Sequence, residues 1–428
     1  MKNTYQHFNK IIFISSIGTV IEWSEFAFYG YMTIQIAKLF FPQEDPRVAI
    51  LSTLGLFAAG FIMRPLGSIV IGHIADTWGR KKALLYSMIL MGLATFCIGI
   101  LPTYQSVRLI APALLLICRL LQGFAVASEC FGAAVFLIEH SKEKNPILAG
   151  SWPGLAAALG ATIGGICALC VAHSTWHSAW RIPFIIGSIS CIIGLYLRQK
   201  IAESPIFQEM HDNNKLLRIP LLSIIKEQSS HVIKCAAMGM FVATMMYVGN
   251  IYFLTYLVQL GKMPTENALL ITTIGQCMVV LFFPLGALVA KKWGIEFSIR
   301  LHLILLFFSA PFIFIFGKTG NIYFAFCAQF IYAFLNAMIT SPMFKWLYDE
   351  FPPSMRVTGI TVPWNIAVAL LGGTSPLIVQ YLVYKSNCNI APGFYVSLCS
   401  IIMLFCTYLR SSAVHSYKRT SINAYVPL

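Results

Sequence analysis

Long runs of apolar residues occupy almost the whole chain and are separated by short polar links. Each run contains about 20 residues with few charges, the length that an α-helix needs to cross the hydrocarbon core of a bilayer. The pattern predicts membrane-spanning helices over residues 11–37, 48–74, 83–101, 109–139, 147–172, 180–198, 233–258, 266–290, 299–317, 321–346, 357–383 and 392–410. We therefore expect an all-α polytopic membrane protein with twelve transmembrane helices.

A long polar stretch interrupts this pattern after the sixth predicted helix. It divides the chain into an N-terminal six-helix bundle, a linker, a C-terminal six-helix bundle and a short tail, over residues 1–198, 199–232, 233–410 and 411–428. The halves resemble each other, since Gly79 and Gly294 close the links after the second and the eighth helix. Two pseudo-symmetric bundles of this kind place a substrate site at mid-membrane between them.

The composition agrees with a chain surrounded by lipid. Only 11% of the residues are charged, against about 25% in soluble domains. The net charge of +14 does not indicate a nucleic-acid partner, because the cations lie in the links rather than on one solvated face. Most of them, Arg198 included, fall in one set of alternate links and in the two tails. The positive-inside rule then places both termini, the linker and the tail in the cytoplasm.

Residues 72–82 form the most informative link. A single acid, Asp76, stands among glycines and three cations, where it can cap a helix end or pair with Arg80. The glycines allow two helix ends to approach closely. We predict that a set of residues near the cytoplasmic end braces or gates the bundles, namely Arg64, Gly72, Asp76, Gly79, Arg80, Glu139 and Arg356.

Five ionisable residues lie inside predicted spans, where such groups are costly and are functional candidates by default: Glu22, Glu25, Arg64, Arg119 and Glu129. Glu22 and Glu25 share one helix face with Tyr29. Removal from water favours the protonated form of a carboxyl group, and a nearby arginine opposes this. The three glutamates are therefore predicted to carry protons or bind substrate, with Arg119 as their charge partner. The alternative is an ion pair that only holds helices together.

The second half offers neutral polar and aromatic groups instead of buried acids. This contrast suggests that the first bundle carries charge and protons and that the second supplies hydrogen bonds and aromatic walls. A tryptophan face also suits a quaternary ammonium group. The predicted substrate-binding residues are Trp23, Tyr29, Gln122, Trp152, Asn250, Tyr252, Tyr256, Gln276, Asn336, Trp364 and Asn365.

The link over residues 72–82 resembles the signature of the major facilitator superfamily between its second and third helices, although Thr77 replaces a usual cation. The resemblance implies the twelve-helix fold of that superfamily. A second copy, over residues 286–294, has Lys291 and Lys292 but no acid. A charge latch between the bundles is therefore expected on one side only.

A more specific resemblance, to the metabolite:H+ symporter family, covers nearly the whole chain. This family includes proline/betaine, dicarboxylate, citrate and shikimate carriers. Its marks here are residues 18–26, 29–30, 59–67, 119–125, 128–129, 150–152, 180–184, 203–205, 356–360 and 372–376. Ser24, Glu25, Ala127 and Ser128 depart from the family pattern, in the first and fourth helices.

The resemblance implies a secondary transporter of a bacterial inner membrane that imports a small polar metabolite with a proton by alternating access. A proline- or betaine-like zwitterion suits buried acids and aromatics, and an organic acid suits Arg119. A proton-independent exchanger and a proton-driven exporter remain alternatives. The sequence shows no catalytic constellation, nucleotide loop or metal cluster, so an enzyme is not expected. The expected partners are substrate, protons and lipid, the proton gradient replaces any cofactor, and a monomer suffices.

Overall fold

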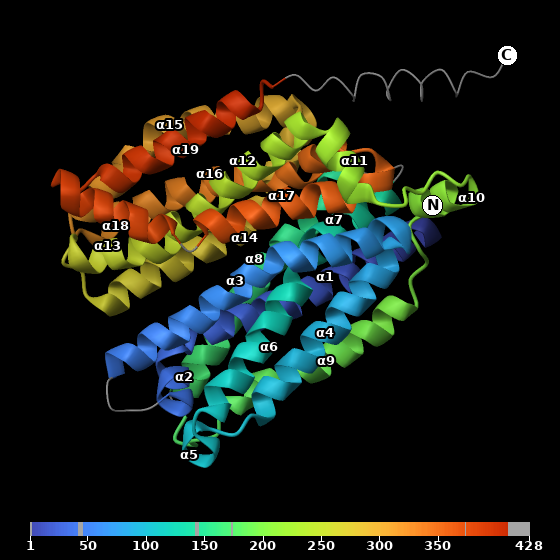
Figure 1. Cartoon of the computed structure of the whole chain (residues 1–428). Coiled ribbons are helices and arrows are strands. Elements are labelled where there is room, and N and C mark those ends of the chain that lie inside the picture. Colours follow the sequence, from blue (N-terminus) through green and yellow to red (C-terminus); the bar gives the residue numbers. More distant parts are fainter. Residues whose placement is uncertain (1, 42–45, 142–144, 173, 373, 410–428) are drawn as a thin grey trace.

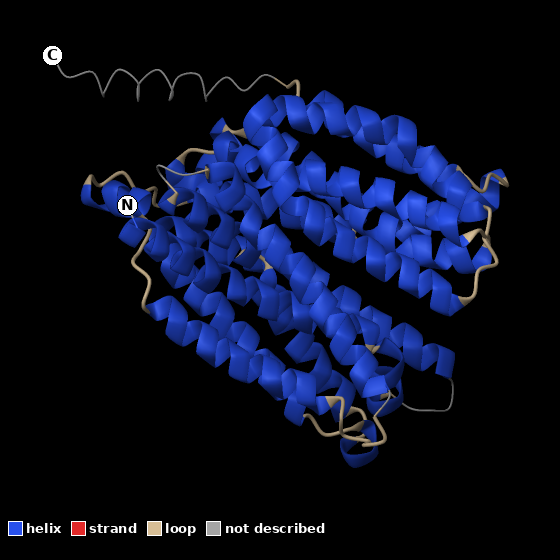
Figure 2. Ribbon diagram, turned by 180° about the vertical axis from the view of Figure 1, so that it is seen from behind, coloured by secondary structure: helices blue, strands red, loops and turns tan. Residues whose placement is uncertain are grey.

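Helices account for the regular structure of the chain. The computed structural model describes residues 2–41, 46–141, 145–172, 174–372 and 374–409, and no strand occurs within these ranges (Figure 2). The predicted tail, residues 411–428, lies outside the described residues. The prediction of an all-α protein is confirmed.

The N-terminal half contains the first nine helices. They are α1 (Lys2–Tyr31), α2 (Thr33–Phe40), α3 (Pro46–Thr77), α4 (Arg80–Ile100), α5 (Tyr104–Val107), α6 (Ile110–Val126), α7 (Glu129–His140), α8 (Pro146–Ala172) and α9 (Arg181–Gln199). Because α6 and α7 form one long apolar passage, this half crosses the apolar layer six times, as predicted. The short helices α2 and α5 lie between passages.

Two short helices, α10 (Pro205–Asp212) and α11 (Pro220–Glu227), form the linker. The C-terminal half follows with α12 (Ser229–Met246), the π-helix η1 (Tyr247–Tyr252), α13 (Phe253–Gln259), α14 (Thr265–Trp293), α15 (Ile295–Lys318), α16 (Ile322–Glu350), the 3-10 turn η2 (Pro353–Met355), α17 (Arg356–Leu371), α18 (Ser375–Ser386) and α19 (Ala391–Cys406). Ten segments are long and apolar enough to cross a membrane. With α3 and α19 the passages number twelve, and this prediction is confirmed.

Four predicted helices differ in detail from those in the structure. The span over residues 11–37 is divided into α1 and α2, and the span over residues 109–139 into α6 and α7. The span over residues 357–383 is divided into α17 and α18. Pro376 lies in the first turn of α18, where a backbone N–H would have no partner within the helix, so a proline is tolerated there. The span over residues 233–258 contains the π-helix η1, which changes the direction of the side chains after Met246. The π-helix is not visible in apolar periodicity. The break before α18 is marked in the sequence by Gly372 and Pro376, which are typical of helix ends.

The two halves lie side by side and diverge toward one end of the molecule (Figure 1). We call the end that carries the N-terminus, α10 and α11 the linker end, and the opposite end, with α2 and α5, the distal end. The halves meet mainly where α3 packs on α17 and where α8 packs on α14 and α16. Large apolar side chains such as Ile62 and Leu281 are 70% and 74% exposed on the outer surface, as expected of side chains that face lipid.

Glycines allow α3 and α6 to touch backbone to backbone. A Cβ at Gly123 would collide with the carbonyl group of Gly60, and one at Gly67 would collide with the carbonyl group of Phe124. Close approach through small residues is the usual way that membrane helices associate. This contact fixes the helices that carry Arg64 and Arg119 against each other.

Substitution of Gly123 by leucine is therefore expected to destabilise the protein. The new side chain has no room, and overpacking costs about 1–3 kcal/mol. Thermal unfolding of the purified protein in detergent measures the effect as a lower transition midpoint. Gly55→Leu is the matched control, because a Cβ at Gly55 meets no atom within 4 Å. Equal midpoints for the two variants would contradict the packing role of Gly123.

Candidate functional site

The three glutamates singled out in the sequence lie inside the N-terminal half. Glu22 and Glu25 on α1 and Glu129 at the start of α7 are 5%, 4% and 2% exposed. The structure divides them between two polar clusters, one around Glu129 and one around Glu25. Their roles in proton transfer or substrate binding remain predictions.

Glu129 forms a buried ion pair with Arg198, which is the last basic residue of α9. Nη2 of Arg198 contacts Oε1 of Glu129, and Nη1 donates to Oε2 at 3.0 Å. Ser87 donates a further hydrogen bond to Oε2 at 2.9 Å. Arg198 also donates to the backbone oxygens of Ser15 and Leu84, both at 3.0 Å. Both oxygens of Glu129 and both terminal nitrogens of Arg198 thus take part in charge-assisted hydrogen bonds, while Nε of Arg198 makes no hydrogen bond to a described residue.

The prediction that Arg119 is the charge partner of Glu129 is therefore wrong. Arg198 follows an apolar run and is expected among the cations of the links, but its side chain is 3% exposed. Helical spacing carries a signal for this placement. Gly187, Cys191, Gly194 and Arg198 follow one another at intervals of three or four residues and form the buried face of α9.

Glu22 lies beside this ion pair. A small cavity of about 10 Å³, with room for about one water molecule, is lined by Glu22, Ser87 and Glu129 together with Gly18, Met88, Met91 and Cys191. Oε1 of Glu22 makes no hydrogen bond to any described residue. A buried carboxylate oxygen without a donor is costly in its charged form, so Glu22 is suited to bind a proton.

Glu25 belongs to a chain of hydrogen bonds that ends at Arg119. Thr95 on α4 donates to Oε2 of Glu25, and Nε2 of Gln122 donates to the Thr95 hydroxyl at 2.8 Å. Nη1 of Arg119 donates to Oε1 of Gln122 at 2.8 Å. Gln122, predicted to bind substrate, thus joins the acid and the base. Arg119 acts on Glu25 through two neutral side chains rather than by direct contact.

Aromatic rings surround the two arginines of α3 and α6. The guanidinium carbon of Arg119 lies 4.0 Å from the ring centre of Tyr29 and 5.3 Å from that of Phe26. The guanidinium carbon of Arg64 lies 4.9 Å from the ring centre of Phe26 and 4.6 Å from that of Phe61. Arg64 therefore belongs to the interior beside α1, and the prediction that it braces the end of the bundle is wrong.

A third polar cluster lies in the C-terminal half. It contains three predicted residues around one tyrosine. Nδ2 of Asn250 lies 3.2 Å from Oε1 of Gln276 and 3.3 Å from the hydroxyl of Tyr332, and Asn336 donates to the same hydroxyl at 3.3 Å. Tyr332 itself donates to the backbone oxygen of Met245 at 2.7 Å. Asn250 lies in the π-helix η1, a type of helix that is frequent at functional sites. Tyr332 was not predicted, although helical spacing carries a signal for it, since Tyr332 shares one face of α16 with Gln329 and Asn336.

The remaining predicted aromatic and amide residues are dispersed. Tyr256 donates to the backbone oxygen of Phe314 at 2.9 Å and packs in the core of its own half with Tyr252. Trp364 lies across the interface against Phe131, with ring centres 4.6 Å apart. Asn365 also spans the interface, because it donates to the backbone oxygen of Ala127 at 2.7 Å.

Two predicted tryptophans lie on the N-terminal half. Trp152, on α8, packs against the core of both halves, and Trp23 contacts Phe26 with ring centres 6.1 Å apart. The indole N–H of Trp23 is buried and makes no hydrogen bond to a described residue. Substrate contact by these tryptophans stays a prediction.

At the linker end, Asp76, Arg80, Glu139 and Arg356 form a buried network that joins the halves, which we call the latch. Oδ1 of Asp76 lies 3.1 Å from Nη1 of Arg80, and Glu139 lies 3.5 Å from Arg80 and 3.2 Å from Arg356. The same Asp76 accepts the backbone N–H groups of Val357 and Thr358, at 3.2 and 2.8 Å. A carboxylate of the first half thus caps the N-terminus of α17 in the second half, where the helix dipole favours negative charge.

Two glycines and the linker complete the latch. A Cβ at Gly72 would lie 3.1 Å from Cα of Thr358, so the absent side chain lets α3 and α17 approach closely. Gly79 has a φ of +123°, which non-glycine residues rarely adopt. Beside it, Glu203 accepts the backbone N–H of Lys81 at 3.1 Å, and Ser204 donates to Glu139. Burial raises the pKa of Glu203, while the N–H groups of Ser204 and Lys81 oppose this shift.

The corresponding link of the second half is different, as expected from its missing acid. Lys291 and Lys292 are exposed, and neither forms an ion pair with a described residue. Instead Glu350, at the end of α16, lies 3.1 Å from Lys234 and 2.6 Å from His231, both on α12. These contacts stay within one half. The latch between the halves is therefore built from the first link, and that expectation is confirmed.

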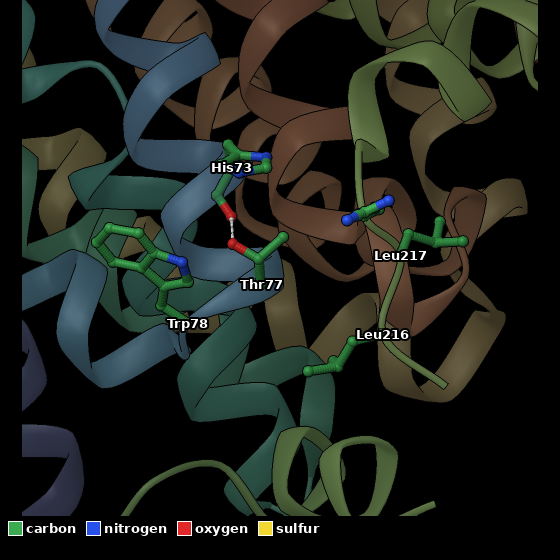
Figure 3. A pocket seen from close by; sticks show the side chains of 6 residues that line it. His73, Thr77, Trp78, Leu216 and Leu217 are labelled. Atoms are coloured by element: carbon green, nitrogen blue, oxygen red, sulfur yellow. Dashed lines mark hydrogen bonds between the residues drawn. The ribbon is translucent and has the colours of Figure 1, made fainter. Parts of the chain in front are cut away.

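A hollow of about 520 Å³ also lies at the linker end, between α3 and the linker (Figure 3). His73, Thr77 and Trp78 form one wall, and Leu216, Leu217 and Arg218 form the other. Thr77 donates to the backbone oxygen of His73 at 2.7 Å. This hollow is separate from the buried glutamates.

The substitution Asp76→Asn is expected to loosen the latch. It removes the charge that the two α17 N–H groups and Arg80 share, and a hydrogen bond to a charged group contributes about 1.5–3 kcal/mol. The amides of Val357 and Thr358 should exchange their hydrogens about tenfold faster or more, as measured by mass spectrometry. Asp349→Asn is the control, since its pair with Lys345 is exposed and stays within α16. Unchanged exchange in Asp76→Asn would show that the carboxylate does not hold α17.

Removal of Arg198 is expected to destabilise the first half strongly. Arg198→Gln leaves Glu129 buried without its partner, at a cost of about 3–5 kcal/mol. The double variant Glu129→Gln/Arg198→Gln leaves no buried charge there and should unfold at a higher temperature than Arg198→Gln alone. A double-mutant cycle on the exposed pair Glu296–Arg300 is the control. Its coupling free energy is expected to be below about 1 kcal/mol. A double variant no more stable than Arg198→Gln would refute the pairing.

Comparison with known proteins assigns the family. The model of the Major Facilitator Superfamily matches residues 26–376. The proline/betaine transporter of Salmonella typhimurium is 30% identical over 411 residues, which cover 92% of this chain and 82% of that protein. The proline/betaine transporter of Escherichia coli K12 is 29% identical over the same lengths.

Solved structures share the fold at low sequence identity. A proton:xylose symporter bound to 6-bromo-6-deoxy-D-glucose superposes with a TM-score of 0.74 at 15% identity, over 94% of this chain and 95% of the other. The human organic anion transporter superposes with a TM-score of 0.71 at 13% identity, over 94% and 99% of the two chains. Together with the twelve helical passages and the latch, these matches show that the chain is a multi-pass membrane transporter, not an enzyme, and belongs to the major facilitator superfamily.

Proposed function

We propose that this protein is a proton-coupled symporter that imports a small zwitterionic or acidic metabolite by alternating access. The observation that carries the proposal is the pair of buried acids on α1. Glu22 and Glu25 are each at most 5% exposed, and one carboxylate oxygen of each makes no hydrogen bond to a described residue. A carboxyl group in such surroundings is less costly when it binds a proton.

A change of conformation is expected to affect the protonation of the two acids differently. Glu22 shares a cavity with Ser87 and with Glu129, whose charge is already paired with Arg198. Glu25 is linked to Arg119 through Thr95 and Gln122. A second negative charge next to Glu129 is unfavourable, so Glu22 is suited to stay protonated. Glu25 can exchange its proton when the surroundings of Arg119 change.

The metabolite class follows from the relatives and from the chemistry of the interface. Relatives that match most of the chain are named proline/betaine transporters. The polar cluster of Asn250, Gln276, Asn336 and Tyr332 supplies hydrogen bonds from the second half, and the buried acids and arginines supply charges from the first. An organic acid is the other metabolite that this set of groups suits.

The setting of the protein belongs to the same proposal. We propose that the linker end and both termini face the cytoplasm of a bacterium and that the molecule lies in its inner membrane. The concentration of cations in one set of alternate links supports this orientation. The latch then closes the cytoplasmic side in the conformation described here. The proton gradient drives the cycle without a cofactor, and one chain contains both halves of the pathway, so a monomer is sufficient.

Substrate-induced proton movement in liposomes tests the proposal. Purified protein is reconstituted, and proline, betaine, dicarboxylates, citrate and shikimate are added while external pH is recorded. One of these solutes should cause alkalinisation outside. Glu25→Gln should lower gradient-driven accumulation at least about tenfold, because the neutral amide cannot carry a proton, while exchange of labelled for unlabelled substrate persists.

Glu266→Gln is the matched control, since Glu266 is exposed in the first turn of α14. Solute movement without any proton signal in the natural protein would replace the symporter by an exchanger. Acidification outside in response to the same inward solute gradient would indicate an exporter. A Glu25→Gln variant with full accumulation would move the coupling role to Glu22 or Glu129.

A further inference from the structure

The two short helices of the linker present opposite outer faces. The outer face of α10 is polar, since its exposed side chains are those of Gln208, Glu209, His211 and Asp212. On α11 the large exposed side chains are apolar instead. Ile219 at the N-cap, Leu222 and Ile225 follow one another every three residues and are 51%, 51% and 64% exposed. We call these three side chains the outer stripe; no described residue covers them, and such a stripe is unfavourable in water.

The opposite face of α11 fixes the orientation of the outer stripe. Ile224 is 2% exposed and belongs to the main hydrophobic core, and Leu217, just before the helix, packs against the same core. The backbone N–H of Lys215 donates to the carbonyl oxygen of Met210 at 2.9 Å and holds the start of this segment to α10. α11 itself packs on α3, α12, α17 and η2. The fold therefore directs the outer stripe away from the protein.

Two exposed tryptophans mark the level of the lipid headgroups at the linker end. Trp78 directly follows α3 and is 56% exposed, and Trp293 is the last residue of α14 and is 50% exposed. Lys291 and Lys292 precede Trp293, and tryptophans beside cations at the ends of membrane helices lie at the headgroup layer. Trp78 also lines the hollow beside the linker, opposite Arg218 (Figure 3). Because α11 begins two residues after Arg218, its start lies at the same level.

The hollow suits an anionic headgroup in size and in charge. It has a volume of about 520 Å³, which is typical of sites for small ligands, and its lining includes His73 and Arg218 but no acid. Arg218 is exposed and forms no ion pair with a described residue. Two further exposed cations, Lys215 and Lys226, lie before α11 and in its last turn. An apolar stripe beside several cations is typical of a helix that lies in the surface of an anionic membrane.

We propose that α11 is an interfacial helix whose outer stripe inserts among the acyl chains, and that the hollow beside Trp78 binds the phosphate of an anionic phospholipid. Arg218 pairs with the phosphate, since guanidinium groups match its oxygens, while Lys215 and Lys226 attract the negative surface. Three side chains are far fewer than a stable contact between proteins needs, so the occupant is lipid. The polar α10 stays in water. The assignment is independent of the transported metabolite and of proton coupling.

Photo-crosslinking of the full-length protein in lipid nanodiscs tests the insertion of α11. The photoreactive amino acid p-benzoylphenylalanine replaces Leu222 in one variant and Gln208 of α10 in the other, and mass spectrometry identifies what each position links to. Position 222 should link to phospholipid, and position 208 should not. Absence of lipid at position 222, or equal labelling at both positions, overturns the interfacial helix. Links from position 222 to a second copy of the chain also overturn it and assign the outer stripe to a contact between copies.

Lipids with the same acyl chains and different headgroups test the phosphate site. Native mass spectrometry of the purified protein compares the affinity for phosphatidylglycerol with the affinity for phosphatidylcholine, and phosphatidylglycerol should bind more tightly. Arg218→Gln should lower the affinity for phosphatidylglycerol about fivefold, as expected for the loss of one cation near an anionic lipid. Lys385→Gln is the matched control and should leave this affinity unchanged, because Lys385 is an exposed cation in the last turn of α18 at the distal end.

Three outcomes overturn the phosphate site. They are equal affinity for the two lipids, an unchanged preference in Arg218→Gln, and an equal loss of affinity in Lys385→Gln. Inorganic phosphate that displaces phosphatidylglycerol at equal concentration would assign the hollow to a soluble anion and overturn the lipid assignment. Both substitutions replace exposed side chains, and unfolding midpoints equal to that of the natural protein separate loss of binding from loss of fold.

Discussion

The cost of charge in an apolar medium governs the organisation of this molecule. The first half places three glutamates and three arginines inside its bundle, and each acid either meets a base, reaches one through hydrogen bonds or keeps room for a proton. Glu129 and Arg198 are held by Ser87 and by two backbone oxygens. Such a network is stable only when every member is satisfied, which explains why four helices must come together in register to form it.

A second consequence concerns how the halves hold each other. The latch contains four charges, and two of them also bind backbone groups across the interface: Asp76 accepts the N–H groups at the start of α17, and Arg80 donates to the backbone oxygen of Pro353 at 2.6 Å. These N–H groups have no partner within their own helix, so the carboxylate satisfies donors that would otherwise need water. Because Arg80 and Arg356 share Glu139, separation of the halves breaks several bonds together, and the closed state is sharply defined.

Helical periodicity gave the correct number of passages and the buried acids of the first half, because both depend only on local pattern. The expectation that the second half has no buried acid is wrong, since Glu350 at the end of α16 is 8% exposed and paired with Lys234. Periodicity could not predict which residues contact one another in the folded protein. Arg198 was interpreted as a surface cation although its spacing with Gly187, Cys191 and Gly194 marks a buried face. Tyr332 was missed although it stands one helical turn before the predicted Asn336, to which its hydroxyl is hydrogen-bonded. Arg64 was assigned to the end of the bundle, whereas packing of α3 on α6 through Gly67 and Gly123 turns it toward Phe26. Sequence thus predicted which residues matter and left their pairing to tertiary packing.

The positions of the charges also suggest how substrate and proton affect each other. The ion pair at Glu129 and the chain from Glu25 to Arg119 lie wholly within the first half, so both can move as part of a rigid bundle while the latch opens. Under the proposed transport function, a substrate that changes the surroundings of Arg119 weakens the support that Arg119 gives to ionised Glu25 through Gln122 and Thr95. Substrate binding then favours the protonated form of Glu25. By thermodynamic reciprocity, protonated Glu25 favours substrate binding, and the two are carried together because each stabilises the other's bound state.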